Sequence, residues 1–152
     1  MKITAQEEYG LRCLLQLARA PHTQIVSVKE IAGKEGLSSA YVEKLLRLLG
    51  RSGLVHSVRG VKGGYVLNRP ASSINLGEVI RALGAVQTTH HICAQFTGNQ
   101  RACVHFNDCG LRSIWSGLTT YIQSFLDRTT LDSLLEREYT VSERLTKRWT
   151  AS

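Results

Sequence analysis

Residues 27–69 read SVKEIAGKEGLSSAYVEKLLRLLGRSGLVHSVRGVKGGYVLNR, and this stretch decides the fold. It begins with the capping box Ser27–Glu30, which predicts a short helix that ends at Gly36. Ser38 is the next N-cap candidate, and the helix after it is expected to run to about Arg51. Two short strands follow, so the order of elements is that of a winged helix–turn–helix, which places one helix in the major groove of DNA.

The longer helix has two distinct faces. An apolar face, expected to be buried, contains Val42, Leu45, Leu46 and Leu49. A second face carries three cations at helical spacing, Lys44, Arg47 and Arg51. A helix that only completes a core needs the first face alone, so the second face predicts contact with a polyanion.

The strands are expected over residues 54–59 and 65–69, joined by a turn rich in glycine. Arg59 and Lys62 lie at this turn. A hairpin that merely completes a small core needs no cations at its tip. The pair is therefore predicted to contact phosphates or to enter a minor groove.

The charge of the chain is unevenly distributed. The net charge is +7, and residues 1–84 carry 12 Lys or Arg against 6 Asp or Glu, whereas residues 85–152 carry 7 against 6. A concentrated positive field attracts nucleic acid. No apolar run is long enough to span a membrane, and MKITAQEEYG lacks the order of a signal peptide, so a cytoplasmic protein without a membrane partner is expected.

Two further helices complete the predicted DNA-binding domain, residues 1–84. The first begins at the capping box Thr4–Glu7 and ends near Ala20, with Cys13 expected to be a small buried hydrophobe. The second begins at Asn75 and ends near Leu83. The expected fold class is mainly α with a small β-ribbon.

Residues 111–138 are predicted to dimerise the protein. Their long helix carries a wide apolar stripe, formed by Leu111, Ile114, Trp115, Leu118, Ile122, Phe125 and Leu126. A small winged helix cannot cover such a stripe, whereas a second copy of the chain can; packing within one subunit is the alternative. A short helix over 129–138 and a loosely ordered tail, 139–152, are expected to follow.

Residues 85–110 form a loop without periodicity that contains Cys93, Cys103 and Cys109, with His90, His91 and His105. Thiolates are preferred ligands of zinc and of iron–sulphur clusters, but the gaps of nine and five residues match neither a zinc ribbon nor a ferredoxin. Metal binding, a redox thiol set and inert cysteines all stay open on spacing alone. An enzyme with a Cys nucleophile and His105 or His91 as base is not expected, because no oxyanion device is visible.

Five blocks resemble the IscR-type family of bacterial winged-helix regulators, which includes NsrR and RirA. They are MKITAQEEYGLRCLLQLA, LSSAYVEKLLRLL, VRGVKGGYVLNRP, SSINLGEVIRAL and LRSIWSGLTTYIQSFLDRTTLDSL, and the resemblance covers roughly residues 1–138. It implies a homodimer in which a three-cysteine loop holds a 4Fe–4S or 2Fe–2S cluster. The state of that cluster would then set the affinity for promoter DNA.

The resemblance also implies site residues. Cys93, Cys103 and Cys109 fall where cluster ligands would be, although the first gap is wider than is usual in the family. IscR uses a His three residues after the third Cys, and this chain has Arg112 there, which cannot ligate. NsrR-like relatives use a carboxylate from the first helix of the partner subunit, and the resemblance places Glu8 there, with Glu7 and the three histidines as alternatives.

For DNA, the family pattern indicates Ser38, Ser39, Tyr41, Lys44 and Arg59, and the charge pattern indicates Lys44, Arg47, Arg59 and Lys62. Glu43 could either accept a hydrogen bond from cytosine or pair with Arg47. The sequence thus predicts a homodimeric repressor of a pseudo-palindromic promoter site, controlled by an iron–sulphur cluster that senses iron, nitric oxide or redox state. The alternative is a cluster-free regulator whose loop is a thiol redox switch or a protein-interaction surface.

Overall fold

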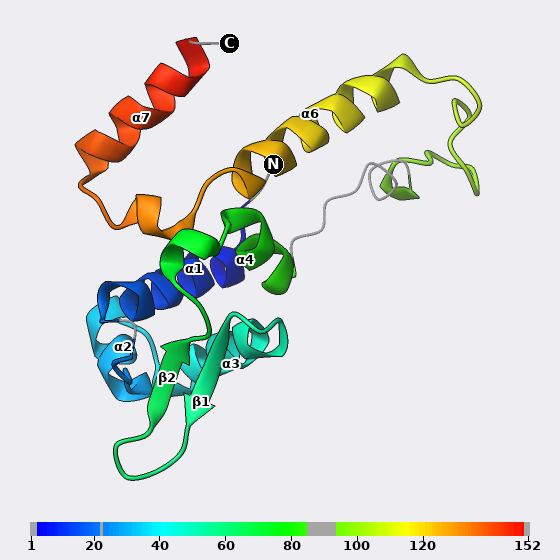
Figure 1. Ribbon diagram of the computed structural model, residues 1–152. Coiled ribbons are helices and arrows are strands. Elements are labelled where there is room, and N and C mark those ends of the chain that lie inside the picture. The colour runs from blue at the N-terminus through cyan, green and yellow to red at the C-terminus, as the bar shows by residue number, and fades with distance from the viewer. Residues whose placement is uncertain (1–2, 22, 85–93, 151–152) are drawn as a thin grey trace.

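The computed structural model describes residues 3–21, 23–84 and 94–150. As Figure 1 shows, most elements form one body, from which two helices near the C-terminus extend. The elements are α1 (Ala5–Arg19), α2 (Val28–Glu35), α3 (Ser39–Arg51), β1 (Val55–Val58), β2 (Gly64–Leu67), α4 (Leu76–Ala82), α6 (Gly110–Asp127) and α7 (Glu138–Thr150), with 3-10 helical turns η1 (Ala71–Ser73) and η2 (Leu131–Leu134). The predicted class, mainly α with a small β-ribbon, is confirmed.

Side-chain caps fix where the helices of the body begin. At α1 the Thr4 hydroxyl accepts the Glu7 N–H, and the Glu7 carboxylate accepts the Thr4 N–H at 2.6 Å, which is the predicted capping box. The side chains of Ser27, Ser38 and Asn75 each accept the N–H three residues later and so cap α2, α3 and α4. The box predicted at Ser27–Glu30 is present only as this N-cap, because the Glu30 carboxylate pairs with Lys34 instead. These starts were read correctly from the sequence because a cap depends on local residues alone.

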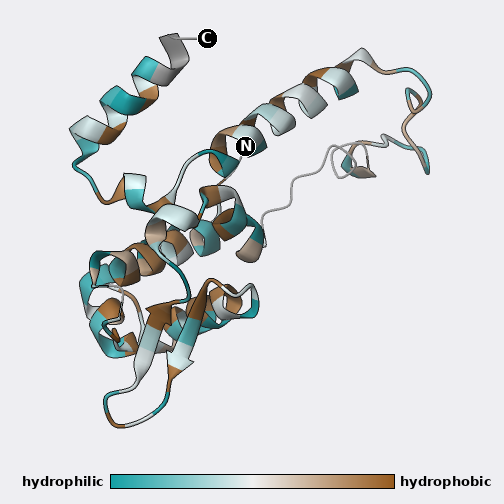
Figure 2. Ribbon diagram, viewed as in Figure 1, coloured by the Kyte–Doolittle hydropathy of each residue, from teal (hydrophilic) through white to brown (hydrophobic). Residues whose placement is uncertain are grey.

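The core lies between α1, α2, α3 and α4. The side chains of Leu14, Ile31, Leu45, Leu46 and Leu49 have no exposed surface, and neither does Cys13, as predicted. In Figure 2 the apolar residues of these helices lie within the body, and further apolar bands recur along α6 outside it. The body therefore has a closed core, whereas α6 extends well beyond it.

The hairpin is antiparallel, and its register pairs Val55 with Leu67 and Val58 with Gly64. Its turn is closed by a hydrogen bond from the Gly63 N–H to the Gly60 carbonyl at 2.9 Å. A Cβ at Gly63 would lie 2.6 Å from the Val58 carbonyl oxygen, so only glycine fits this close turn. The wing predicted from the glycines is confirmed, with strands slightly shorter than expected.

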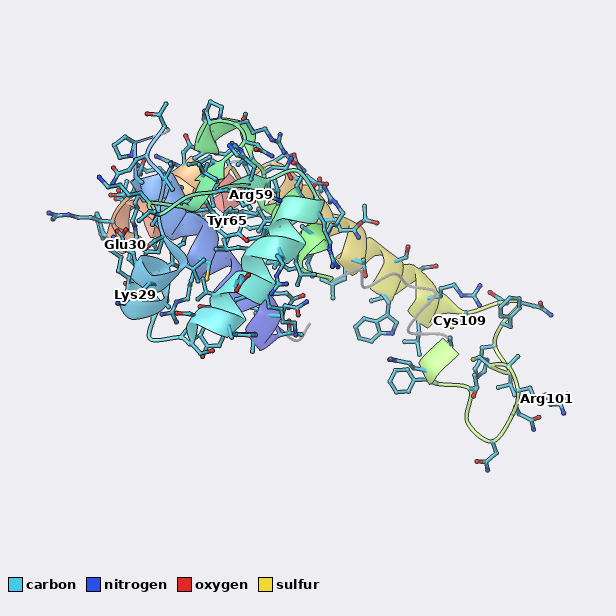
Figure 3. The ribbon with its side chains drawn as sticks, turned by 90° about the horizontal axis from the view of Figure 1, so that it is seen from below. Lys29, Glu30, Arg59, Tyr65, Arg101 and Cys109 are labelled. Carbon is cyan, nitrogen blue, oxygen red and sulfur yellow. The ribbon has the colours of Figure 1, made fainter. Side chains whose placement is uncertain are left out.

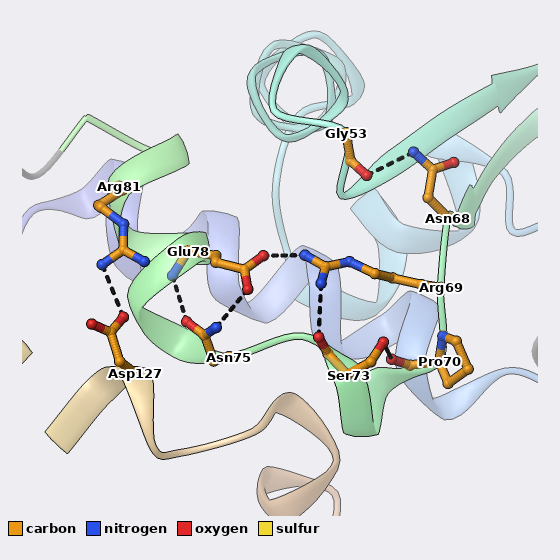
Figure 4. A network of polar contacts seen from close by, with 9 residues as sticks. All are labelled: Gly53, Asn68, Arg69, Pro70, Ser73, Asn75, Glu78, Arg81 and Asp127. Atoms are coloured by element: carbon orange, nitrogen blue, oxygen red, sulfur yellow. Dashed lines mark hydrogen bonds and ion pairs between the residues drawn. The ribbon is translucent and has the colours of Figure 1, made fainter. Parts of the chain in front are cut away.

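The C-terminal end of α6 is fixed to the body. The Leu76 N–H donates to the Thr129 carbonyl and the Leu131 N–H to the Ile74 carbonyl, both at 2.8 Å. Figure 4 shows the polar contacts on this side of the body, including the ion pair between Arg81 and Asp127 at 2.9 Å. Leu131 has no exposed surface, so the segment after α6 completes the core.

The secondary structure after α6 differs from the prediction. The short helix expected over 129–138 is only the turn Leu131–Leu134, and the tail expected to be loosely ordered forms α7. Polar side-chain pairs support α7: the Tyr139 hydroxyl donates to the Glu143 carboxylate at 3.1 Å, and the Arg144 guanidinium donates to the Glu136 carboxylate at 2.6 Å. None of the helices in the described ranges is long and apolar enough to cross a membrane.

Candidate DNA interface and cysteine loop

The recognition helix α3 shows both predicted faces. Val42, Leu45, Leu46 and Leu49 have no exposed surface, so they dock the helix against the body. Lys44, Arg47 and Arg51 are exposed on the other side. The N-cap Ser38 and the following Ser39 are also exposed, so the start of the helix is open to a ligand. A helix start with free N–H groups favours a negatively charged group such as a phosphate.

Tyr41 and Glu43 are already engaged within the subunit. The Tyr41 ring is half-buried and meets the Tyr9 ring edge-on, with 6.1 Å between centroids. The Glu43 carboxylate lies 3.6 Å from the Arg47 guanidinium, which is the i,i+4 pair considered above. Both partners of that pair are largely exposed, so it is weak and easily broken when DNA approaches.

The wing presents its cations at the turn. Arg59 and Lys62 are exposed, and Val61 between them is fully exposed. Arg69, the last cation of residues 27–69, does not lie at the turn of the wing. Its guanidinium donates to the Ser73 carbonyl at 2.8 Å and pairs with the Glu78 carboxylate (Figure 4). Arg69 therefore braces the end of β2 against α4.

A polar cluster joins α1 to α2 behind the recognition helix. The Arg12 guanidinium donates to the Glu35 carboxylate at 2.6 Å, and the Gln16 amide donates to the same carboxylate. The hydrogen bond with Glu35, and then its charge, raise the pKa of Arg12. Arg12 also lies over the Tyr9 ring, 5.4 Å from its centroid. Through Tyr9 the cluster reaches Tyr41 in the first turn of α3.

The described part of the cysteine loop lies far from this body. Figure 3 shows Arg59 on the body, and Cys109 and Arg101 at the far end of α6. Cys103 and Cys109 are half-buried free thiols, and Cys109 stands at the N-cap of α6. His105 is exposed. Cys93, His90 and His91 lie outside the described residues.

The predicted fourth ligand and its alternative differ in their surroundings. The Glu7 carboxylate is nearly buried and accepts the Thr4 N–H, so it is occupied as a cap. Glu8 is exposed on the surface of α1. No three potential metal-ligating side chains come together within the described ranges, which do not include Cys93.

The donor chemistry of the loop fits an iron–sulphur cluster. Cys103 and Cys109 are unpaired, and thiolates are the ligands that such clusters require. The N-terminus of α6 carries the positive end of the helix dipole, and its first turn contains no acidic residue. Negative charge is therefore favoured where Cys109 lies.

The sequence pattern gave no role to Arg112 beyond its inability to ligate. In the structure its guanidinium donates to the carbonyls of His105 and Phe106. These contacts cannot be predicted from the neighbouring sequence, because they depend on how the loop folds back on α6.

Comparison with known proteins identifies the family. The model of the family described as Rrf2, iron-dependent transcriptional regulator, matches residues 3–137. The chain belongs to the Rrf2 family. It is 31% identical over 138 residues to a putative HTH-type regulator of Neisseria meningitidis, covering 91% of this chain and 90% of the relative. It is 32% identical over 138 residues to IscR of Klebsiella pneumoniae, covering 91% and 82%.

Solved structures of Rrf2 proteins share its fold. IscR of T. potens superimposes with a TM-score of 0.70 at 32% identity, covering 89% of this chain and 86% of that one. CymR of B. subtilis, described as the global cysteine regulator, gives 0.71 at 30% identity, covering 89% and 96%. These winged-helix neighbours confirm the fold predicted from residues 27–69.

Membership of the Rrf2 family settles the broad function. The chain is a transcriptional regulator of the helix–turn–helix type, and the DNA-binding role predicted from α3 and the wing agrees with it. The family consists of regulators, so the Cys-nucleophile enzyme is excluded, as expected. The matched range ends at residue 137, just before α7 begins.

Proposed function

We propose that this Rrf2 protein is a homodimeric repressor whose affinity for a pseudo-palindromic promoter site is controlled by an iron–sulphur cluster in the cysteine loop. One arrangement carries the proposal. The free thiols lie at one end of α6, the other end of α6 is fixed to the DNA-binding body, and an apolar face is exposed between them.

That apolar face supports the dimer. Leu111, Ile114, Trp115, Leu118 and Tyr121 are between 42% and 67% exposed, although they are large and lie on one side of one helix. Leu126, nearer the body, packs against the core instead. A second copy related by two-fold symmetry offers the same apolar face in return, so α6 pairing with α6 covers both.

Each subunit then contributes one DNA-binding surface, formed by α3 and the wing. The cationic face of α3 enters the major groove, with Lys44 and Arg47 toward phosphates or bases and Ser38 and Ser39 at the helix start. The wing places Arg59 and Lys62 beside the adjacent groove. The two α3 helices of a dimer must match half-sites about one helical turn of DNA apart.

The cysteine loop supplies the signal. Cys93, Cys103 and Cys109 would hold the cluster, with Glu8 of the partner subunit as the fourth ligand. Such a cluster, when bound, supplies iron and sulphide that react with nitric oxide or oxidants and that are lost when iron is scarce. A ligand set shared between one subunit's loop and the partner's α1 ties the relative position of the two subunits to the state of the loop, and therefore ties the spacing of the two α3 helices to it.

Spectroscopy of anaerobically purified protein tests the cluster. We expect a brown protein with iron–sulphur absorption and Mössbauer signals. Cys93→Ala, Cys103→Ala and Cys109→Ala should each remove the colour, and Cys13→Ala should keep it because Cys13 is buried in the body. A colourless wild type that contains zinc or no metal contradicts the cluster.

A thiol switch is the second candidate, and two findings favour it. Cys103 and Cys109 are unpaired and only half-buried. CymR of Staphylococcus aureus, 32% identical with a TM-score of 0.69, was solved in an oxidized form. If this candidate holds, metal-free protein should lose titratable thiols on mild oxidation and change its DNA affinity in step.

Salt dependence tests the DNA interface. Lys44→Gln and Lys62→Gln should each weaken binding to all duplexes and lower the slope of log K against log salt by about 0.9 for each lost phosphate contact. Lys147→Gln on α7 is the matched control and should leave the slope unchanged. Equal slopes for wild type and both interface variants would remove these lysines from the interface.

A further inference from the structure

Arg112, in the first turn of α6, reaches back over the cysteine loop. Its guanidinium donates to the Phe106 carbonyl at 2.5 Å and to the His105 carbonyl at 3.4 Å. The same group lies over the Phe106 ring, 5.4 Å from the centroid. One side chain therefore holds two consecutive loop residues by three contacts.

These contacts connect the two thiols that the structure describes. The Phe106 N–H donates to the Cys103 carbonyl at 3.0 Å, which closes a turn that begins at Cys103. The Arg112 N–H donates to the Cys109 carbonyl at 3.1 Å, where Cys109 caps α6. Arg112 thus joins the turn that carries Cys103 to the helix end that carries Cys109.

Helix formation alone does not explain an arginine at this position. A cation in the first turn of a helix is disfavoured by the helix dipole, and α6 has no acidic residue in that turn to compensate. The two loop carbonyls compensate instead, because a planar guanidinium can donate to both while its face lies on Phe106. A guanidinium has no lone pair for a metal, so it acts on the loop and not as a ligand.

We propose that Arg112 is a positioning residue that clamps the cysteine loop on α6 and sets the separation and partial burial of Cys103 and Cys109. This inference deepens the proposed function, on which it rests for its biological purpose. The clamp exists in the chain itself, so it orders the two thiols before any cluster binds.

Thiol alkylation of full-length, metal-free protein tests the clamp under anaerobic conditions. Iodoacetamide is the probe, and mass spectrometry follows each cysteine separately. Arg112→Ala should raise the alkylation rates of Cys103 and Cys109 by roughly three- to tenfold, because local opening of the loop exposes them. Cys13 should stay unreactive in every variant, which reports that the body remains folded.

Two further variants separate the clamp from charge. Arg112→Lys keeps the positive charge but cannot donate to both carbonyls while stacking on Phe106, so it should resemble Arg112→Ala. Arg101→Ala removes an exposed arginine of the same loop and should behave as wild type. Wild-type rates in Arg112→Ala, or full rescue by Arg112→Lys, would overturn the clamp.

Cluster reconstitution then separates this inference from the proposed function. If both hold, Arg112→Ala should lose its cluster to a chelator several times faster than wild type and show an altered visible circular dichroism spectrum. A wild type that takes up no cluster contradicts the proposed function, while the alkylation rates still decide on the clamp. Unchanged alkylation in Arg112→Ala contradicts the clamp even if wild type holds a cluster.

Discussion

Gly10 lies where α1 passes the end of α4, and a Cβ there would be 2.4 Å from Cδ2 of Leu83 and 2.6 Å from Cδ1. Leu83 is only 2% exposed, so its side chain can move aside only by displacing its core neighbours. Gly10→Ala should therefore lower the free energy of unfolding by about 1–3 kcal/mol, measured by urea denaturation. Gly33→Ala is the control, because nothing lies within 4 Å of its added Cβ in α2; it should stabilise by about 0.5–1 kcal/mol.

Cys13 gives a second prediction at the scale of one residue. Burial, and then the negative charge of Glu35, raise the pKa of the Cys13 thiol to about 11 from its usual 9.0. Between these two values the unfolded chain has released this proton while the folded chain keeps it. Stability should therefore fall as pH rises through this window, by up to about 1.4 kcal/mol per pH unit from this thiol.

The measurement is a comparison of urea denaturation between pH 8.5 and 11 for wild type and Cys13→Ala. Other groups titrate in the same range but are shared by both proteins, so the difference in slope belongs to Cys13. The variant should show the flatter profile. Parallel profiles would mean that the thiol titrates alike in the folded and unfolded states.

Residues differ in how far the sequence predicts their roles. Ser38 and Glu7 were placed correctly because a cap involves neighbours three residues away. Cys13 was expected to be buried because leucines flank it at helical spacing. Arg69 and Arg112 were not understood, since their carboxylate and carbonyl partners depend on the folded chain. The roles of Glu8 and of the cysteines stay predictions.

At the scale of elements, Glu35 joins α2 to α1 by polar contacts in addition to the shared core. Its side chain is only 7% exposed and accepts hydrogen bonds from Arg12 and Gln16. Glu35→Ala should lower the urea midpoint clearly, since two donors lose their acceptor at a shielded site. Lys34→Ala breaks an exposed pair with Glu30 and should cost no more than about 1 kcal/mol. Equal midpoints for the two variants would show that the Glu35 cluster contributes nothing beyond a surface pair.

Elements with a strong period were predicted well, and those without one were not. Helices α1 to α4 combine side-chain caps with an apolar stripe, α6 has the stripe without a side-chain cap, and the glycines of the wing fixed its turn. The helix α7 was missed because its support comes from polar pairs such as Tyr139 with Glu143, which resemble a solvated tail. The helix predicted over 129–138 is too long, because the leucines that suggested it pack against the core of the body from the short turn Leu131–Leu134.

At the scale of the whole molecule, the exposed face of α6 predicts the assembly. Trp115→Asp should convert the proposed dimer to a monomer and weaken binding to a two-half-site operator by about 100-fold or more, because the second half-site is then bound independently. Thr120→Asp adds the same charge to the opposite, exposed side of the helix and should change neither property. Sedimentation velocity and operator titration measure the two effects. A dimeric Trp115→Asp protein would place the interface elsewhere.

Because Leu131 closes the core, the body can finish folding only late in the synthesis of the chain. The buried Leu131, held by its N–H bond to the Ile74 carbonyl, follows the cysteine loop and α6 in the chain, although it belongs to the DNA-binding body. A ribosome therefore completes that body only after it has made the cysteine loop and α6. A chain that stops before Leu131 lacks part of its core, so a truncated product without the cysteine loop and α6 should be less stable than the full chain.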